Sequence, residues 1–186
     1  MFRQLNFIRK IKRFIRILNS VQIVESVEEL RARGVKIGEN TDLYSTNIDY
    51  NHGHLVEIGD NVSISTNVTI LAHDASTKKK IGYTKIAGVK IGNGSWVGSG
   101  CIILPGTTIG DNVIIGAGSV VRGTIPDNSV AIGNPAKIIC STSEYIEKNK
   151  KKLEEYPVFN KACNEMSDKE IDALKKQIRG EMGFEP

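Results

Sequence analysis

The chain has 186 residues, of which 40% are apolar, as is usual for a globular protein, while aromatic residues are sparse at 6%. It contains no run of about twenty uninterrupted apolar residues, which excludes a membrane-spanning helix. Its three cysteines, at unrelated spacings, form neither a disulfide framework nor a metal motif. The formal charge is +4, but residues 1–24 carry six basic residues and no acid, so the remainder has 4 − 6 = −2. This charge does not suggest a nucleic-acid partner.

The N-terminal segment, residues 1–34, is predicted to be helical. Apolar residues recur at helical spacing within 2–18, with basic residues mainly between them: Phe7, Ile8, Ile11, Phe14, Ile15 and Leu18. Such a helix either packs on the end of the next domain, which is favoured because an open sheet end must be covered, or contacts an anionic membrane through residues 1–20. A second short helix is expected around 25–33, ending at Gly34.

The central part, residues 35–140, carries a six-residue repeat. Aliphatic residues stand six positions apart, and a small or β-branched residue follows each one four positions later: Ile91, Val97, Ile103, Ile109, Ile115 and Val121, then Ser95, Cys101, Thr107, Val113, Ser119 and Ile125. This period is typical of a parallel β-helix, in which three hexads close one triangular turn. Both sets are expected to face the interior, and residues 37–138 to supply about five turns.

The repeat is broken twice, and the breaks point to function. An irregular stretch spans 49–55, and Ile58 lies 33 positions before Ile91, so the phase slips within 74–88. This lysine-rich segment is predicted to be a loop thrown out of the coil, and His73 immediately precedes it. Functional groups are often found where a scaffold's regularity fails. Because a neutral imidazole is a natural general base, His73 is the candidate catalytic residue.

The C-terminal segment, residues 141–186, is charged and predicted to be helical. Two Ser-x-x-Glu capping boxes, at 141–144 and 167–170, each predict the start of a helix. Pro157 separates the two helices and Gly180 ends the second. This extension is expected to pack against the coil, and no chemistry is visible in it.

The run IGNGSWVGSGCIILPGTTIGDNVIIGAGSVV, with the later IPDNSVAIGNPAKII, resembles the left-handed β-helix acyltransferases with hexapeptide repeats. The resemblance covers about residues 37–140 and is strongest to the maltose, galactoside and lipopolysaccharide O-acetyltransferases. It implies an all-β fold, a left-handed parallel β-helix with helical segments at both ends. It also implies a homotrimer in which acetyl-CoA lies between adjacent coils, and no metal.

The resemblance assigns roles to individual residues. A histidine at the edge of the coil removes the proton of the acceptor hydroxyl in that family, and the matching residue is His73. The acetyl-CoA positions match Ser99, Ala117 and Lys137. The family's V-T-K-D-I-P reads V-R-G-T-I-P here, without the lysine, and Arg122 is expected to compensate in binding the phosphates.

The acceptor pocket is expected from the two irregular stretches, 44–54 and 74–88. Side chains suited to sugar hydroxyls are present in the first: Asp49, Tyr50, Asn51 and His54. The leading hypothesis is an O-acetyltransferase acting on a sugar or glycan in the cytoplasm, since no secretory signal pattern is present, or at the inner membrane face if residues 1–20 bind lipid. Two alternatives stay open: a streptogramin-type antibiotic O-acetyltransferase, and a non-catalytic β-helix scaffold.

Overall fold

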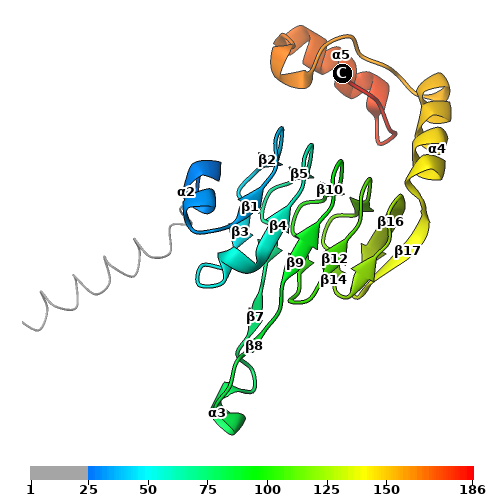
Figure 1. Ribbon diagram of the computed structural model, residues 1–186. Helices are drawn as coiled ribbons and strands as arrows, with labels where there is room; N and C mark the ends of the chain where they lie inside the picture. The colour runs from blue at the N-terminus through cyan, green and yellow to red at the C-terminus, as the bar shows by residue number, and fades with distance from the viewer. Residues whose placement is uncertain (1–24) are drawn as a thin grey trace, which may run out of the picture.

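The computed structural model describes residues 25–186 (Figure 1). The predicted amphipathic helix and its membrane contact lie outside the described residues. Within residues 25–186, no helix has both the length and the apolar character needed to cross a bilayer.

The first described element is α2 (Val27–Ala32), which covers the N-terminal end of the coil. Ser26 starts the helix, because its side chain accepts a hydrogen bond from the Glu29 amide while the Glu29 side chain accepts from the Ser26 amide. Leu30 is buried in the core of the coil, and Gly34 leaves the helix with a φ of +89°. The predicted short helix before Gly34 is therefore confirmed.

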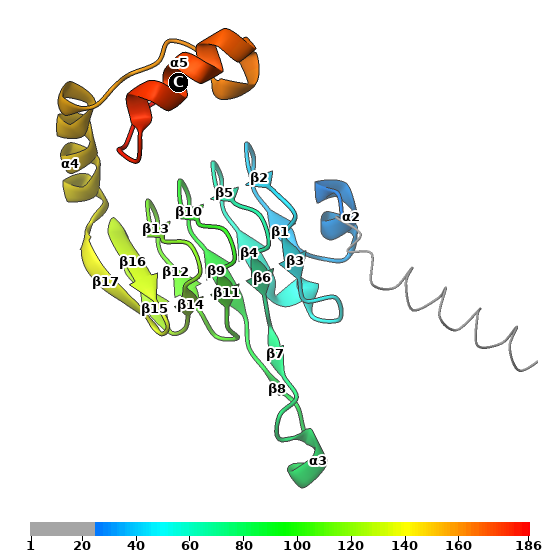
Figure 2. The same cartoon turned by 180° about the vertical axis from the view of Figure 1, so that it is seen from behind.

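Short strands stack into three parallel sheets, which form the faces of a triangular prism (Figures 1 and 2). The first face consists of β1 (Lys36–Ile37), β4 (Val56–Ile58), β9 (Val89–Ile91), β12 (Thr108–Ile109) and β15 (Thr124–Ile125). The second consists of β2 (Asp42–Leu43), β5 (Ser63–Ile64), β10 (Trp96–Val97), β13 (Ile114–Ile115) and β16 (Ser129–Gly133). The third consists of β3 (Asn47–Ile48), β6 (Thr69–Ile70), β11 (Ile102–Ile103) and β14 (Val120–Val121). The chain visits the three faces in this order, which confirms the β-helix and about five turns.

The interior is a stack of aliphatic side chains from successive coils. In the first face, Ile91 pairs with Ile109 and Ile109 with Ile125, and all three are buried. The small residues at the fifth hexad position are buried as well, as predicted. Ile125 is buried too, but it does not lie at the fifth position of a hexad. It occupies the strand position that faces inward, because the corner after Val121 is shortened, so the last coil leaves the six-residue phase.

A ladder of side chains joins the coils at the corner between the first and second faces. Each acidic or amide side chain accepts a hydrogen bond of 2.7–2.8 Å from a backbone amide of the preceding coil; the acceptors are Asp60, Asn93, Asp111 and Asp127. The residue before each donor amide is a glycine, and a Cβ there would lie within 2.1–2.4 Å of the incoming Oδ1. A Cβ on Gly110 would lie 2.1 Å from the Asp127 Oδ1 and 2.6 Å from its amide nitrogen. The repeated Ile-Gly-Asp/Asn pattern thus has a steric cause.

Replacing Gly110 by alanine is expected to lower the free energy of unfolding by about 2 kcal/mol, because the new methyl group overlaps the Asp127 backbone. Gly88→Ala is the matched control, since its Cβ would lie at an ordinary contact distance, 3.5 Å, from the Leu55 carbonyl oxygen. Both changes remove the same unfolded-state entropy, which therefore cancels. Thermal unfolding of the two variants side by side measures the difference, and equal melting temperatures would contradict the clash.

The predicted loop is an arm that projects from the corner between the third and first faces (Figure 2). The strands β7 (His73–Asp74) and β8 (Lys85–Ile86) pair antiparallel, and α3 (Lys78–Ile81) forms its tip. A salt bridge of 2.6 Å between the Asp74 Oδ2 and the Lys85 Nζ joins the two strands. The segment therefore leaves the coil as predicted, but it has its own pairing.

The C-terminal end of the coil is closed by a hairpin. β17 (Ala136–Ser141) pairs antiparallel with β16, where the sequence predicts only a less regular final turn. α4 (Thr142–Glu155) and α5 (Asp168–Ile178) begin at the two predicted capping boxes. The Thr142 Oγ1 donates to the Asn112 carbonyl at 2.7 Å, which anchors α4 on the coil. Beyond Ser143, the described part of the extension makes no hydrogen bond to the coil, and α5 turns back above the corner loops (Figures 1 and 2).

Candidate active site

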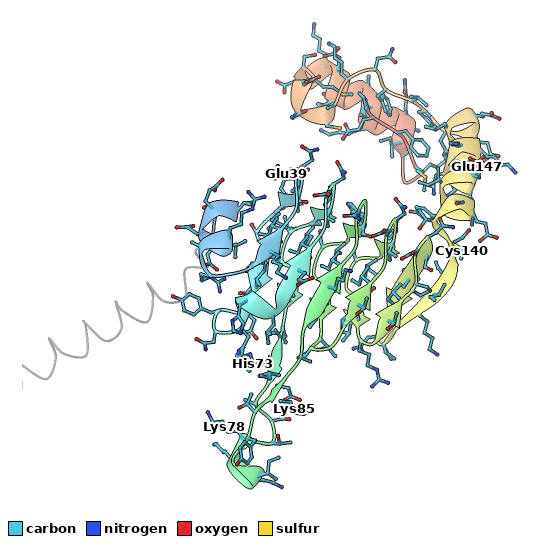
Figure 3. All side chains as sticks on the ribbon, viewed as in Figure 1. Glu39, His73, Lys78, Lys85, Cys140 and Glu147 are labelled. Atoms are coloured by element: carbon cyan, nitrogen blue, oxygen red, sulfur yellow. The ribbon has the colours of Figure 1, made fainter. Side chains whose placement is uncertain are left out.

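The two irregular stretches meet at one corner of the prism. Both follow a strand of the third face: residues 49–55 follow β3 and the arm follows β6, and β3 pairs with β6. The first stretch ends in a short 3-10 helix, η1 (Gly53–Leu55). His73 lies at the root of the arm, with Lys85 and then Lys78 farther out (Figure 3). The candidate site is therefore formed by residues from two successive coils.

Asp49 is the centre of this site. Its side chain is only 1% exposed, and each of its carboxylate oxygens accepts hydrogen bonds from one imidazole and one backbone amide. Oδ2 accepts from the His73 Nδ1 and from the Ala72 amide at 3.0 Å. Oδ1 accepts from the His52 Nδ1 and the His52 amide, both at 3.2 Å. The carboxylate is thus fully hydrogen-bonded, as a buried charged group must be.

These hydrogen bonds keep Asp49 ionised. Burial alone would raise its pKa, but the hydrogen bonds from His73, from the Ala72 amide and from His52 outweigh burial and hold the pKa of Asp49 at about 2. An ionised carboxylate has no proton to donate, so the Nδ1 of His73 must be the donor. In the neutral ring, the Nε2 of His73 then carries the free lone pair, on a side chain that is 33% exposed. This is the tautomer that a general base needs.

A groove of about 960 Å³ lies beside His73. Its wall includes apolar side chains from two successive coils and from the arm, among them Leu71, Leu104 and Ile86. Asp74, Lys85 and Arg122 also line it, and Lys85 is paired with Asp74. Arg122 therefore supplies the positive charge of the groove, which suits a ligand with an apolar arm and a negative charge. Arg122 is therefore on the same edge of the prism as His73.

The predicted acetyl-CoA positions Ser99 and Ala117 lie on a different edge, the corner between the second and third faces. They are exposed on successive coils, and the Gly118 amide donates to the Ser99 carbonyl at 2.8 Å. The Ser99 hydroxyl lies 2.6 Å from that of Ser65. Lys137 is exposed on β17, opposite Ile132. One protomer therefore does not bring Ser99 and Ala117 together with His73.

The predicted acceptor residues differ in their positions. Tyr50 is 74% exposed, and the Arg33 guanidinium stacks on its ring at 4.8 Å. Asn51 and His54 are also exposed, but neither lines the groove beside His73. The direct acceptor contact predicted for Asp49 does not fit the structure, because its carboxylate is buried and both oxygens are occupied by hydrogen bonds.

Two residues of this site have no role in the sequence prediction. His52 shares the carboxylate with His73, and Arg33 holds the loop from below by donating to the carbonyls of Asp49 and Tyr50 at 3.2 and 2.8 Å. Arg33 is itself held by a bidentate pair with Glu25, at 2.6 Å for each bond. The sequence indicates only by position that the two irregular stretches meet, because both follow strands of the same face in successive coils.

The ligand atoms of Asp49, His52 and His73 lie within 4.8 Å of one another, a spacing that could also hold a metal ion. In the structure each carboxylate oxygen is bonded to an imidazole nitrogen and to a backbone amide, so hydrogen bonds alone account for this arrangement.

Comparison with known proteins places this geometry in a family. Residues 88–123 match the model of the bacterial transferase hexapeptide (six repeats). A crystal structure of a maltose O-acetyltransferase from Clostridium difficile 630 is 34% identical, with a TM-score of 0.50, over 70% of this chain and 83% of that one. The chain belongs to the hexapeptide-repeat acetyltransferase family. This membership confirms the predicted left-handed β-helix.

Further members of the hexapeptide-repeat family match over the coil. A galactoside acetyltransferase in complex with coenzyme A is 32% identical, with a TM-score of 0.54, over 64% of this chain and 71% of that chain. The galactoside O-acetyltransferase of Escherichia coli (strain K12) is 46% identical over 89 residues, which are 46% of this chain and 44% of that protein. The chain spans about half the length, or less, of the first curated relatives it matches.

Proposed function

We propose that the protein transfers an acetyl group from acetyl-CoA to a hydroxyl of a sugar or glycan, with His73 as the general base. The observation that carries this proposal is the hydrogen bond between the His73 Nδ1 and the buried Asp49 carboxylate, at the root of the arm. In the neutral imidazole this bond leaves the lone pair of the outer nitrogen of His73 free beside a groove. The relatives named as galactoside and maltose acetyltransferases support the donor and the class of acceptor.

The chemistry follows from the acidity of the two partners. A sugar hydroxyl is too weak an acid for imidazole to deprotonate in advance, so the His73 Nε2 takes the proton as the hydroxyl oxygen bonds to the thioester carbonyl carbon. The tetrahedral intermediate collapses by breaking the carbon–sulfur bond. The CoA thiolate leaves with the proton held by His73, and the acetyl ester remains on the acceptor. Asp49 stabilises the imidazolium that exists between these steps.

Acetyl-CoA would bind between two protomers of a trimer. Ser99 and Ala117 are exposed on one edge of the prism, where the pantetheine arm can lie along the coils, and Lys137 is exposed at the end of the coil. Arg122 and His73 are on another edge. Because both edges must contribute, a site between adjacent protomers accounts for the separation of the predicted residues.

The acceptor would approach from the side of Tyr50, Asn51 and His54, which remain the proposed acceptor contacts. All three are exposed on the loop that carries Asp49. We place the protein in the cytoplasm, a compartment that suits its three unpaired cysteines.

The proposed function is tested by incubating the purified protein with acetyl-CoA and a panel of mono- and disaccharides, with streptogramins as a separate set of acceptors. Mass spectrometry of the acceptors is the suitable readout, because the exposed Cys163 would react with reagents that detect released thiol. An acetyl ester on a sugar is the expected product. Acetylation of the antibiotics alone would contradict the sugar assignment. Absence of both transfer and stabilisation by acetyl-CoA would indicate a scaffold.

A further inference from the structure

His52 shares the Asp49 carboxylate with His73. Its Nδ1 lies 3.2 Å from Oδ1, while the His73 Nδ1 is bonded to Oδ2. The two imidazole rings lie against each other, with centroids 4.8 Å apart and planes inclined by 34°. The His52 side chain is 25% exposed and that of His73 is 33% exposed, so water reaches both rings while each stays bonded to the carboxylate.

From this geometry we propose that His52 is a positioning residue whose protonation switches off the general base. This inference rests on the proposed function of His73 as the general base. With both rings neutral, each donates its Nδ1 proton to Asp49 and the His73 Nε2 is free. A protonated His52 would form an ion pair with Asp49 and so weaken the interaction of Asp49 with His73. It would also place a positive charge against the face of the His73 ring. His73 must itself become positive during transfer, so this form opposes the reaction.

The other charged groups around the pair do not provide the same effect. Asp74, next to His73, is bound to Lys85 at 2.6 Å on the arm. The Arg33 guanidinium donates to backbone carbonyls below the loop and is neutralised by Glu25. His54, on η1, has its ring centroid 6.3 Å from that of His52 and no hydrogen bond to Asp49. The shared carboxylate and the ring contact therefore couple His52 to His73 alone.

Coupled groups lose their protons in two steps that belong to the pair. Activity that requires both rings to be neutral falls with a limiting slope of about 2 in log kcat against pH on the acid side, and a single titrating ring gives a slope of about 1. His52→Asn is the matched variant, because its amide nitrogen can replace the Nδ1 donor to Asp49 without titrating. His52→Phe keeps a ring against His73 but has no donor.

The experiment is the pH profile of kcat for the wild type, His52→Asn and His52→Phe, with thermal unfolding to show that each variant folds. Both variants are expected to reduce the acid slope from about 2 to about 1. His52→Phe should be about tenfold slower than His52→Asn, the cost of one lost hydrogen bond. A purely structural role would lower kcat at every pH and leave the slope unchanged, which would overturn the proposal.

A readout that does not depend on activity separates this inference from the proposed function. The NMR signals of the His73 ring should titrate in two steps in the wild type and in one step in His52→Asn. Identical titrations in the two proteins would refute the coupling, whether or not acetyl transfer is seen. A two-step titration in a protein that acetylates no acceptor would keep the coupling and refute the acetyltransferase.

Discussion

Replacing His73 by alanine is expected to lower kcat for acetyl transfer by about 10²–10⁴-fold, the usual contribution of a general base. In the proposed mechanism, the His73 Nε2 takes the hydroxyl proton. Acetyl-CoA binding should persist, because Ser99 and Ala117 lie on another edge of the prism. Steady-state kinetics with calorimetric titration of acetyl-CoA measures both quantities.

His73→Asn is the control that separates catalysis from structure. Asparagine can still donate to the Asp49 carboxylate, so the buried charge keeps its partner and the fold should keep its stability. It carries no basic nitrogen, and its kcat should therefore fall as far as that of the alanine variant. A rate near that of the wild type in either variant would refute the role of His73.

Asp49→Asn is expected to have the second largest effect, a fall in kcat of roughly 10²-fold. This corresponds to about 3 kcal/mol, the size of one hydrogen bond to a charged group. The amide can neither stabilise the imidazolium by charge nor accept on both sides. The matched control is Asp60→Asn, at a ladder position whose counterpart in the next coil, Asn93, is already an asparagine. Kinetics of both variants measure the effect, and equal rates would contradict it.

Asp49 also makes stability depend on pH. Its pKa is lowered from 3.8 to about 2 in the folded protein, so ionised Asp49 stabilises the fold above about pH 4. This stabilisation is lost as the pH falls from about 4 to 2, because the carboxylate must then be protonated. Acid unfolding should therefore be less steep in Asp49→Asn, and circular dichroism over this range would show it.

The hexads predict the coil because a buried strand position recurs every six residues, and a one-dimensional pattern of this kind needs no tertiary information. His73 could be found in the same way, from the loss of phase between Ile58 and Ile91. The partners of His73 could not. Asp49 lies 24 positions earlier in an irregular stretch, and only the pairing of β3 with β6 shows that the two meet.

The lack of tertiary information in the sequence also explains the other differences between the prediction and the structure. Ile125 follows Val121 by four positions, as a fifth hexad residue would, but the corner between them is shortened and Ile125 fills a strand position. The polar character of Asp49 suggests a sugar contact, whereas in the structure its carboxylate is buried and hydrogen-bonded to His52 and His73. Residue type alone does not distinguish a carboxylate that faces the acceptor from one that orients the base.

Mixed trimers test most directly whether one active site is built from two protomers. His73→Ala disables one edge and Ala117→Tyr, at an exposed position, blocks the other. Co-expressed in equal amounts, the two inactive variants should recover about one quarter of the wild-type activity, because a quarter of the interfaces then pair two intact edges. The double variant mixed with wild type should also give about one quarter, against about one half for a site within one protomer. No recovery in the first mixture, or one half in the second, would contradict the shared site.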